Sequence, residues 1–177
     1  MLSRLAVPFE VVPSAVDERL EGSFHPADYV KRLAMRKAGA VAERFPDDFV
    51  IGADTIVVLD SQILGKPGNR DEARNMLTRL SGKTHSVYTG VSIWHQGDHT
   101  CFFEKTDVTF WNLTPDEIER YIQSGEPYDK AGAYGIQGFA SIFVKRMEGD
   151  YFTVVGLPIG RLYRELVRMG YPFFPAP

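Results

Sequence analysis

The chain has 177 residues, of which 44% are hydrophobic and 24% are charged, with a formal net charge of −3 at pH 7. These proportions are typical of globular domains and exclude disordered, collagen-like and coiled-coil proteins. The length favours a single domain, and a chain of this size buries roughly 70% of its unfolded surface, so it needs neither disulfides nor a structural metal. The negative net charge argues against a broad nucleic-acid-binding surface, which is normally basic.

Cysteine content and hydrophobic runs predict a cytoplasmic protein. Cys101 is the only cysteine, so no internal disulfide can form and a reducing compartment fits best. The longest apolar runs, such as Ile56–Leu59, are far shorter than the ~20 residues of a membrane span. The first twenty residues lack the hydrophobic region of a signal peptide. We therefore expect no contact with a membrane.

The first 45 residues predict a helical turn, an extended segment, a loop and one long helix. Met1–Phe9 resembles the last turn of a helix, and it runs into an extended segment at Phe9–Val12. Pro13–Ser23 is polar and is predicted to be a loop. Pro26–Phe45 has apolar residues at helical spacing, and Pro26 suits a first helical position.

Lys37 breaks the apolar stripe of this helix, because it lies four residues after Leu33 and four before Val41. A charge at such a position is costly unless the side chain snorkels to solvent or meets an anion. Snorkelling is common for lysine, and the residues alone leave both interpretations open.

Asp54 interrupts a near-continuous apolar run at Phe49–Leu59, which predicts a strand covered on both faces. An aspartate inside such a strand needs a partner for its charge or a raised pKa, and both are typical of active sites. The alternative is a kink at Gly52–Thr55 where Asp54 caps a turn.

Lys66 follows in a Gly-Lys-Pro loop. It either faces Asp54 or an anionic substrate, or is a solvated loop residue.

Two further helices are predicted from their caps. Asn69 with Glu72 three residues later resembles a capping box, and it predicts a helix that ends before Gly82. The Thr-Pro-Asp-Glu sequence at residues 114–117 predicts another helix, which ends at Gly125.

Four strand-like runs predict two hairpins. Val87–Trp94 and Cys101–Phe110 form the first, and Ser141–Arg146 and Tyr151–Val155 flank a Glu-Gly-Asp turn in the second. The aromatic residues of the first hairpin are either core residues or a dimer surface. They are Phe102, Phe103, Phe110 and Trp111.

The remaining features carry weaker signals. Gly132–Gly138 holds three glycines in seven residues, so its backbone either admits a ligand and exposes N–H groups to anions, or is simply a glycine-rich lead into a strand. His95 and His99 flank a turn but lack the third ligand of a zinc site. Ile159–Met169 is predicted to be the last helix, and the proline-rich end after Gly170 is predicted to be loose.

Taken in chain order, these pieces match the motifs of one family over almost the whole chain. The matching stretches are Val7–Val12, Asp17–Glu18, Leu33–Ala34, Lys37–Ala38, Gly52–Thr55, Leu64–Pro67, Ser81–His85, Gly132–Gly138 and Gly156–Pro158. The chain resembles the Maf proteins, which are nucleoside triphosphate pyrophosphatases. The resemblance implies an α/β fold related to inosine triphosphatases, with a mixed elongated sheet flanked by helices. It implies one domain over residues 1–177, with two lobes around a central cleft.

The resemblance also implies the site residues and their roles. Asp54 and Glu18 are the expected catalytic residues, with Asp54 orienting or deprotonating water and Glu18 assisting with water or metal. The expected substrate-binding residues are Lys37, Thr55, Lys66 and Gln137. Lysines would hold the phosphates, and Gln137 would read the base edge.

The substrate and cofactor follow from the same resemblance. Thr55 after the aspartate and the Gly-Ile-Gln-Gly stretch are similar to the branch that hydrolyses dTTP and UTP to the monophosphate and pyrophosphate. Mg²⁺ is the expected ion, because carboxylate and phosphate oxygens are hard ligands. Asp54 and Glu18 are the candidate metal ligands.

One departure from the family lies at the N-terminus. Family members open with a strand and a Ser-x-Ser-Pro-Arg-Arg loop before the helix whose end corresponds here to Met1–Leu5. We therefore expect a chain that is N-terminally truncated relative to the family, through a late start codon or as a degenerate paralogue. The rival hypothesis is a catalytically impaired Maf-like binding or regulatory protein linked to cell division. For the enzyme and for the regulatory protein alike, a homodimer is an expected partner, with the aromatic residues of the first hairpin as its candidate surface.

Overall fold

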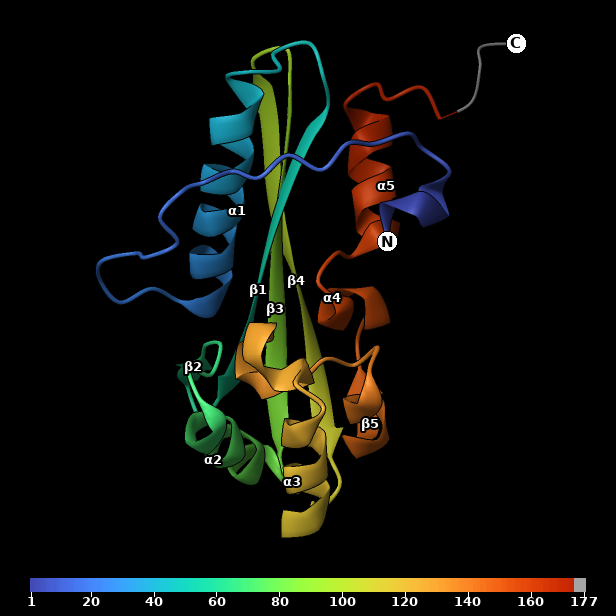
Figure 1. Ribbon diagram of the computed structural model, residues 1–177. Helices are drawn as coiled ribbons and strands as arrows, with labels where there is room; N and C mark the ends of the chain where they lie inside the picture. The colour runs from blue at the N-terminus through green and yellow to red at the C-terminus, as the bar shows by residue number, and fades with distance from the viewer. Residues whose placement is uncertain (174–177) are drawn as a thin grey trace. The chain divides into compact units, whose positions relative to one another are not determined.

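The computed structural model describes residues 1–173, so the last four residues of the predicted loose end lie outside the described part. The structure contains a five-stranded sheet with the order β2-β1-β3-β4-β5 (Figure 1). Its strands are β1 (Val50–Leu59), β2 (Gln62–Leu64), β3 (Thr84–His95), β4 (Asp98–Phe110) and β5 (Val144–Glu148). The predicted α/β class is confirmed, with the refinement that the sheet is antiparallel rather than mixed; β1 pairs antiparallel with β2, and β4 pairs antiparallel with β5.

The helical elements divide between two compact units of the chain. The α-helices are α1 (Pro26–Ala42), α2 (Arg70–Leu80), α3 (Pro115–Gln123), α4 (Tyr151–Val155) and α5 (Ile159–Arg168). The 3-10 helices are η1 (Leu2–Leu5), η2 (Glu126–Asp129), η3 (Ala131–Ala133) and η4 (Phe139–Phe143). Unit 1 consists of Met1–Asp54, Thr89–Glu104 and Gly156–Pro177, and unit 2 of Thr55–Tyr88 and Lys105–Val155.

In unit 1, α1 and α5 pack against segments of β1, β3 and β4. Figure 1 shows the two helices on opposite sides of these strands. Two glycines let α1 approach the strands at van der Waals distance. A Cβ at Gly52 of β1 would lie 2.7 Å from the backbone of Ala34 and Ala38, and one at Gly90 of β3 would overlap the backbone of Val30. The position of α1 on the strands is therefore fixed by direct contact between the helix backbone and these two glycines.

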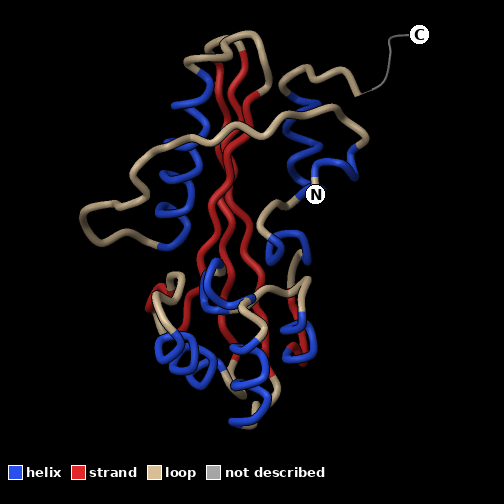
Figure 2. Tube along the Cα trace, in the orientation of Figure 1, coloured by secondary structure: helices blue, strands red, loops and turns tan. Residues whose placement is uncertain are grey.

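The N-terminal segment after η1 crosses unit 1 without regular structure. Figure 2 shows residues 7–25 as a continuous loop that runs from η1 to α1. The helical turn predicted at the N-terminus is observed as η1, and the loop predicted at Pro13–Ser23 is confirmed.

In unit 2, α2 and α3 pack on each other and share one hydrophobic core with the strands. Both predicted caps are present. The Asn69 side chain accepts from the Glu72 N–H at 2.9 Å, and Thr114 and Glu117 form a complete capping box. Gly125 follows α3 in the left-handed region, with φ 79°, as its position after the helix predicts.

The first predicted hairpin is confirmed and is longer than predicted. β3 and β4 are joined by a turn at Gln96–Gly97, so His95 and His99 lie in the strands. Phe102 and Phe110 are buried, which places them in the core rather than on a dimer surface. Trp111 is exposed, and the Lys145 ammonium lies 4.9 Å from its ring centroid.

The second predicted hairpin is wrong in its second strand. Tyr151–Val155 forms the helix α4. The N–H groups of Phe152 and Thr153 donate to the Asp150 carboxylate, which caps the first turn. The aromatic and β-branched residues favoured a strand, but this local cap outweighs their preference. Within residues 1–173, no helix has the length and hydrophobicity needed to cross a membrane.

Candidate active site

Lys37 of α1 lies between two carboxylates of unit 1. Its Nζ donates to Asp54 Oδ1 at 2.7 Å and lies 2.9 Å from Glu18 Oε1. The Asp54 side chain is 10% exposed and the Glu18 side chain 53% exposed. Lys37 therefore meets anions rather than merely snorkelling. Asp54 lies inside the continuous strand β1, so the alternative that it caps a turn is wrong.

The charge of Lys37 is set by two opposing effects. Burial pushes its pKa down, but the hydrogen bonds to Asp54 and Glu18 outweigh burial, and the pKa lies above its usual value. The ammonium is therefore charged at neutral pH. The pKa of Tyr29 is also raised, first by burial and then by the negative charges of Asp54 and Glu18.

Close packing of α1 on β1 brings the lysine to the aspartate. Gly52 allows the backbones to approach at Ala34 and Ala38. Asp54 is two residues after Gly52, so both face the same side of the strand. Lys37 adjoins Ala38 in the helix. The short distance between the Lys37 ammonium and the Asp54 carboxylate thus depends on the absence of a side chain at Gly52.

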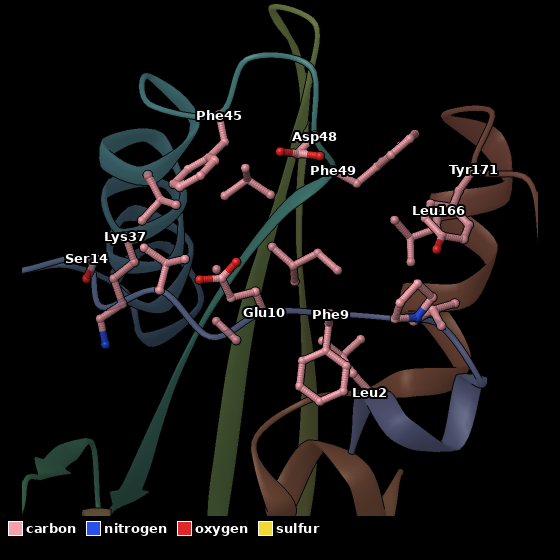
Figure 3. Close-up of a pocket in the computed structure, with 18 of the residues that line it drawn as sticks. Leu2, Phe9, Glu10, Ser14, Lys37, Phe45, Asp48, Phe49, Leu166 and Tyr171 are labelled. Atoms are coloured by element: carbon pink, nitrogen blue, oxygen red, sulfur yellow. The ribbon is translucent and has the colours of Figure 1, made fainter.

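A cavity of about 600 Å³ in unit 1 borders this charged cluster. Apolar side chains from residues 7–12, the end of α1 and the start of β1 form most of its wall. Figure 3 shows Lys37 at the edge of this cavity and the Glu10 carboxylate near its middle. Lys37 is therefore shared by the cavity and the carboxylate pair.

In unit 2, the glycine-rich segment 132–138 is held by backbone and side-chain hydrogen bonds. The Gly132 N–H donates to the Gly65 carbonyl at 3.0 Å, which brings the segment to the loop that carries Lys66. The Gly135 N–H donates to the Tyr121 hydroxyl at 3.2 Å. Gly132 has φ 67° and faces Val57, so a side chain there would be both strained and crowded.

His85 and Tyr134 support the same segment from the core. The His85 Nε2 lies 2.8 Å from the Tyr134 hydroxyl oxygen. Burial lowers the pKa of His85 to about 4 and raises the pKa of Tyr134, so both are neutral at pH 7.

The two histidines of the β3–β4 hairpin stack on aromatic rings. His95 stacks on Phe49 with 3.8 Å between ring centroids, and His99 stacks on Trp94 at 4.5 Å. No group of three or more possible metal ligands occurs among residues 1–173.

Comparison with known proteins agrees with the motif pattern. A family model described as "Maf-like protein" matches residues 1–169. The chain belongs to the Maf family. A Bacillus cereus relative named dTTP/UTP pyrophosphatase is 57% identical over 166 residues, which are 94% of this Maf chain and 87% of the relative. A Bacillus anthracis relative of the same name is 55% identical over the same shares of both chains.

The structure places the predicted site residues of this Maf chain in two groups. Glu18, Lys37 and Asp54 come together in unit 1. Lys66 and Gln137 lie in two hydrogen-bonded segments of unit 2, and Gln137 is exposed. Thr55 directly follows Asp54 in β1 and is the first residue of unit 2.

The sequence analysis did not identify two residues that lie near the carboxylates of this Maf chain. Tyr29 lies eight positions before Lys37 on α1, and that helical spacing was its only signal. Arg36 donates from Nη1 to the carbonyl oxygens of Asp17 at 2.7 Å and Arg19 at 3.0 Å. An exposed arginine on a helix is usually a solvated residue, so nothing in the pattern pointed to this contact.

Proposed function

We propose that this protein is a nucleoside triphosphate pyrophosphatase that converts dTTP and UTP to the monophosphate and pyrophosphate. The observation that carries the proposal is the Lys37 ammonium held between Asp54 and Glu18 in a chain of the Maf family. The relatives named dTTP/UTP pyrophosphatase support the choice of substrate.

The reaction needs an aligned water and neutralised phosphate charge. The water oxygen forms a bond to the α-phosphorus, the bond from that phosphorus to the bridging oxygen breaks, and pyrophosphate leaves. Asp54 orients the water and accepts its proton, because a carboxylate bonded to one ammonium retains further lone pairs. Lys37 has three N–H donors and directs two toward carboxylates, so a third can bind a phosphate oxygen.

The unit 1 carboxylates suit a hard divalent ion, for which we propose Mg²⁺. Mg²⁺ is typically held by one or two carboxylates together with substrate phosphates and water, and Asp54 and Glu18 supply two such oxygens. When bound, the ion would neutralise charge on the phosphates. Glu18 would serve as its ligand or as a partner of the water.

Unit 2 supplies the proposed recognition residues. Lys66 binds phosphate, and Thr55 and Gln137 bind the nucleoside. An amide side chain offers both a donor and an acceptor, which match the O4 and N3–H edge shared by thymine and uracil. A site that reads this edge without contacting C5 accepts both bases, because thymine and uracil differ only in the C5 methyl group.

We also propose that the protein acts in the cytoplasm, where free nucleotides are made and used.

We further propose a homodimer, which is supported by the exposed apolar side chains of Trp111 and Ile142 in unit 2. Sedimentation of the wild type beside a Trp111→Ser, Ile142→Ser double variant tests it. A dimer is expected for the wild type only.

The function is tested by incubating the purified protein with dTTP, UTP or ATP in the presence of Mg²⁺ and measuring pyrophosphate. Pyrophosphate is expected from dTTP and UTP. Orthophosphate as first product, or equal turnover of ATP, would contradict the proposal.

The Asp54→Asn variant tests the catalytic role of Asp54. Asparagine has the shape of aspartate and can still accept a hydrogen bond from Lys37, so the variant is expected to lower kcat by about a hundredfold to ten-thousandfold without changing the melting temperature. Asp98→Asn, at the exposed first residue of β4, is the control with unchanged kcat.

A further inference from the structure

The segment that carries Glu18 has no regular secondary structure. Residues 13–25 form neither helix nor strand, so no helix or sheet hydrogen bonds order their backbone. Glu18 is 53% exposed, and exposed ion pairs contribute little to ordering a chain. The contact with Lys37 is therefore too weak to fix the Glu18 carboxylate by itself.

Arg36 anchors the chain on both sides of Glu18. Its Nη1 donates to the Asp17 carbonyl at 2.7 Å and to the Arg19 carbonyl at 3.0 Å. The Asp17 carboxylate also accepts from the Arg19 N–H at 2.9 Å, which closes a tight turn around Glu18. One guanidinium nitrogen thus bridges the two carbonyls that flank the carboxylate residue.

Arg36 and Lys37 are adjacent on α1, so one helix sets both the ammonium and the turn that presents Glu18. We propose that Arg36 is a positioning residue that holds Glu18 against Lys37 and thereby supports hydrolysis. The catalytic part of this inference rests on the proposed function.

The test compares three single variants of the full chain. Arg36→Met keeps the aliphatic stem but removes the donors, and Arg36→Lys retains a charged donor. Arg32→Met is the matched control, because Arg32 lies one turn earlier on α1, is exposed, and contacts the ring of Phe24 rather than the turn around Glu18.

Two readouts are measured for each variant: hydrogen exchange of the amides in residues 15–20, and kcat and KM for dTTP. Arg36→Met is expected to speed exchange and lower kcat by about tenfold each, because hydrogen bonds to charged groups are stronger than neutral ones. KM should change little, and Arg36→Lys should recover part of both effects. Arg32→Met should stay within about twofold of the wild type in both. Equal effects of Arg32→Met and Arg36→Met would overturn the proposal.

A double-mutant cycle shows whether Arg36 acts through Glu18. In a Glu18→Gln background, adding Arg36→Met is expected to cause no further loss of kcat, and additive losses would overturn the proposal. Unchanged exchange in Arg36→Met would overturn it without any activity measurement. If the wild type released no pyrophosphate, or Glu18→Gln kept full kcat, the proposed function of Glu18 would fail, while the exchange data would still decide whether Arg36 holds the turn.

Discussion

Replacing His85 would show how strongly burial controls ionisation in the core of unit 2. His85 is 2% exposed, and its Nδ1 has no hydrogen-bond partner among the described residues. Burial is the largest influence and lowers its pKa from 6.5 to about 4, although the negative charge of Asp107 acts in the opposite direction. A proton on this ring is therefore costly in the folded state.

The expected effect on stability follows from this pKa. A folded-state pKa of about 4, against 6.5 in the unfolded chain, corresponds to about 3.5 kcal/mol at about 1.4 kcal/mol per pH unit. Above pH 6.5 the imidazole is neutral in both states and adds no pH dependence. As pH falls from 6.5 to 4, only the unfolded state binds the proton, so the free energy of unfolding decreases. Below pH 4 both states are protonated and the loss is complete.

His85→Gln removes the titration while keeping a polar group that can reach Tyr134. The variant is expected to be less stable than the wild type at pH 7, and the gap should narrow by about 3 kcal/mol by pH 4. Urea unfolding, followed by circular dichroism and tryptophan fluorescence at several pH values, measures this gap. Gln123→Ala, which changes an exposed uncharged side chain of α3, is the control and should retain the wild-type pH dependence. A gap that stays constant from pH 7 to pH 4 would refute the argument.

Three further variants test packing, charge and capping. Gly52→Ala places a methyl group against the backbone of Ala34 and Ala38 and should cost about 2 to 3 kcal/mol of stability, together with most of kcat; a wild-type melting temperature would contradict this. Lys37→Met leaves two carboxylates without their shared cation and should destabilise by about 2 kcal/mol and raise KM for dTTP, as measured by urea unfolding and steady-state kinetics. Thr114→Ala removes the capping box of α3 and should cost about 1 kcal/mol with kcat unchanged, as seen by thermal unfolding and pyrophosphate release.

Local signals in the sequence were sufficient for most helices. Asn69 and Thr114 accept hydrogen bonds within the next three residues, so the starts of α2 and α3 depend on chemistry that the sequence shows directly. The helix α4 was missed because Asp150 has the side chain of both a turn residue and a helix cap. Only the geometry shows that it accepts from Phe152 and Thr153.

The site was predictable as a set of residues but not as a set of contacts. Periodicity placed Lys37 on an apolar face and showed that it needed explaining, whereas its partners lie in a strand and a loop that local patterns cannot bring together. The resemblance to Maf proteins provided that step. Arg36 escaped even the resemblance, because its contacts are to backbone carbonyls, which every residue has and no side-chain motif encodes.

The two glycine contacts beneath α1 impose a spacing rule on any redesigned chain. Gly90 meets the helix at Val30, and Gly52 meets it about one to two turns later, so the helix cannot slide along the strands. A slide of one turn would move Lys37 by about 5.4 Å, well beyond hydrogen-bond reach of Asp54. Inserting or deleting a residue between Val30 and Lys37 would therefore break the ion pair even with every charged side chain retained. Adding residues to α1 after its last buried turn would preserve the ion pair between Lys37 and Asp54.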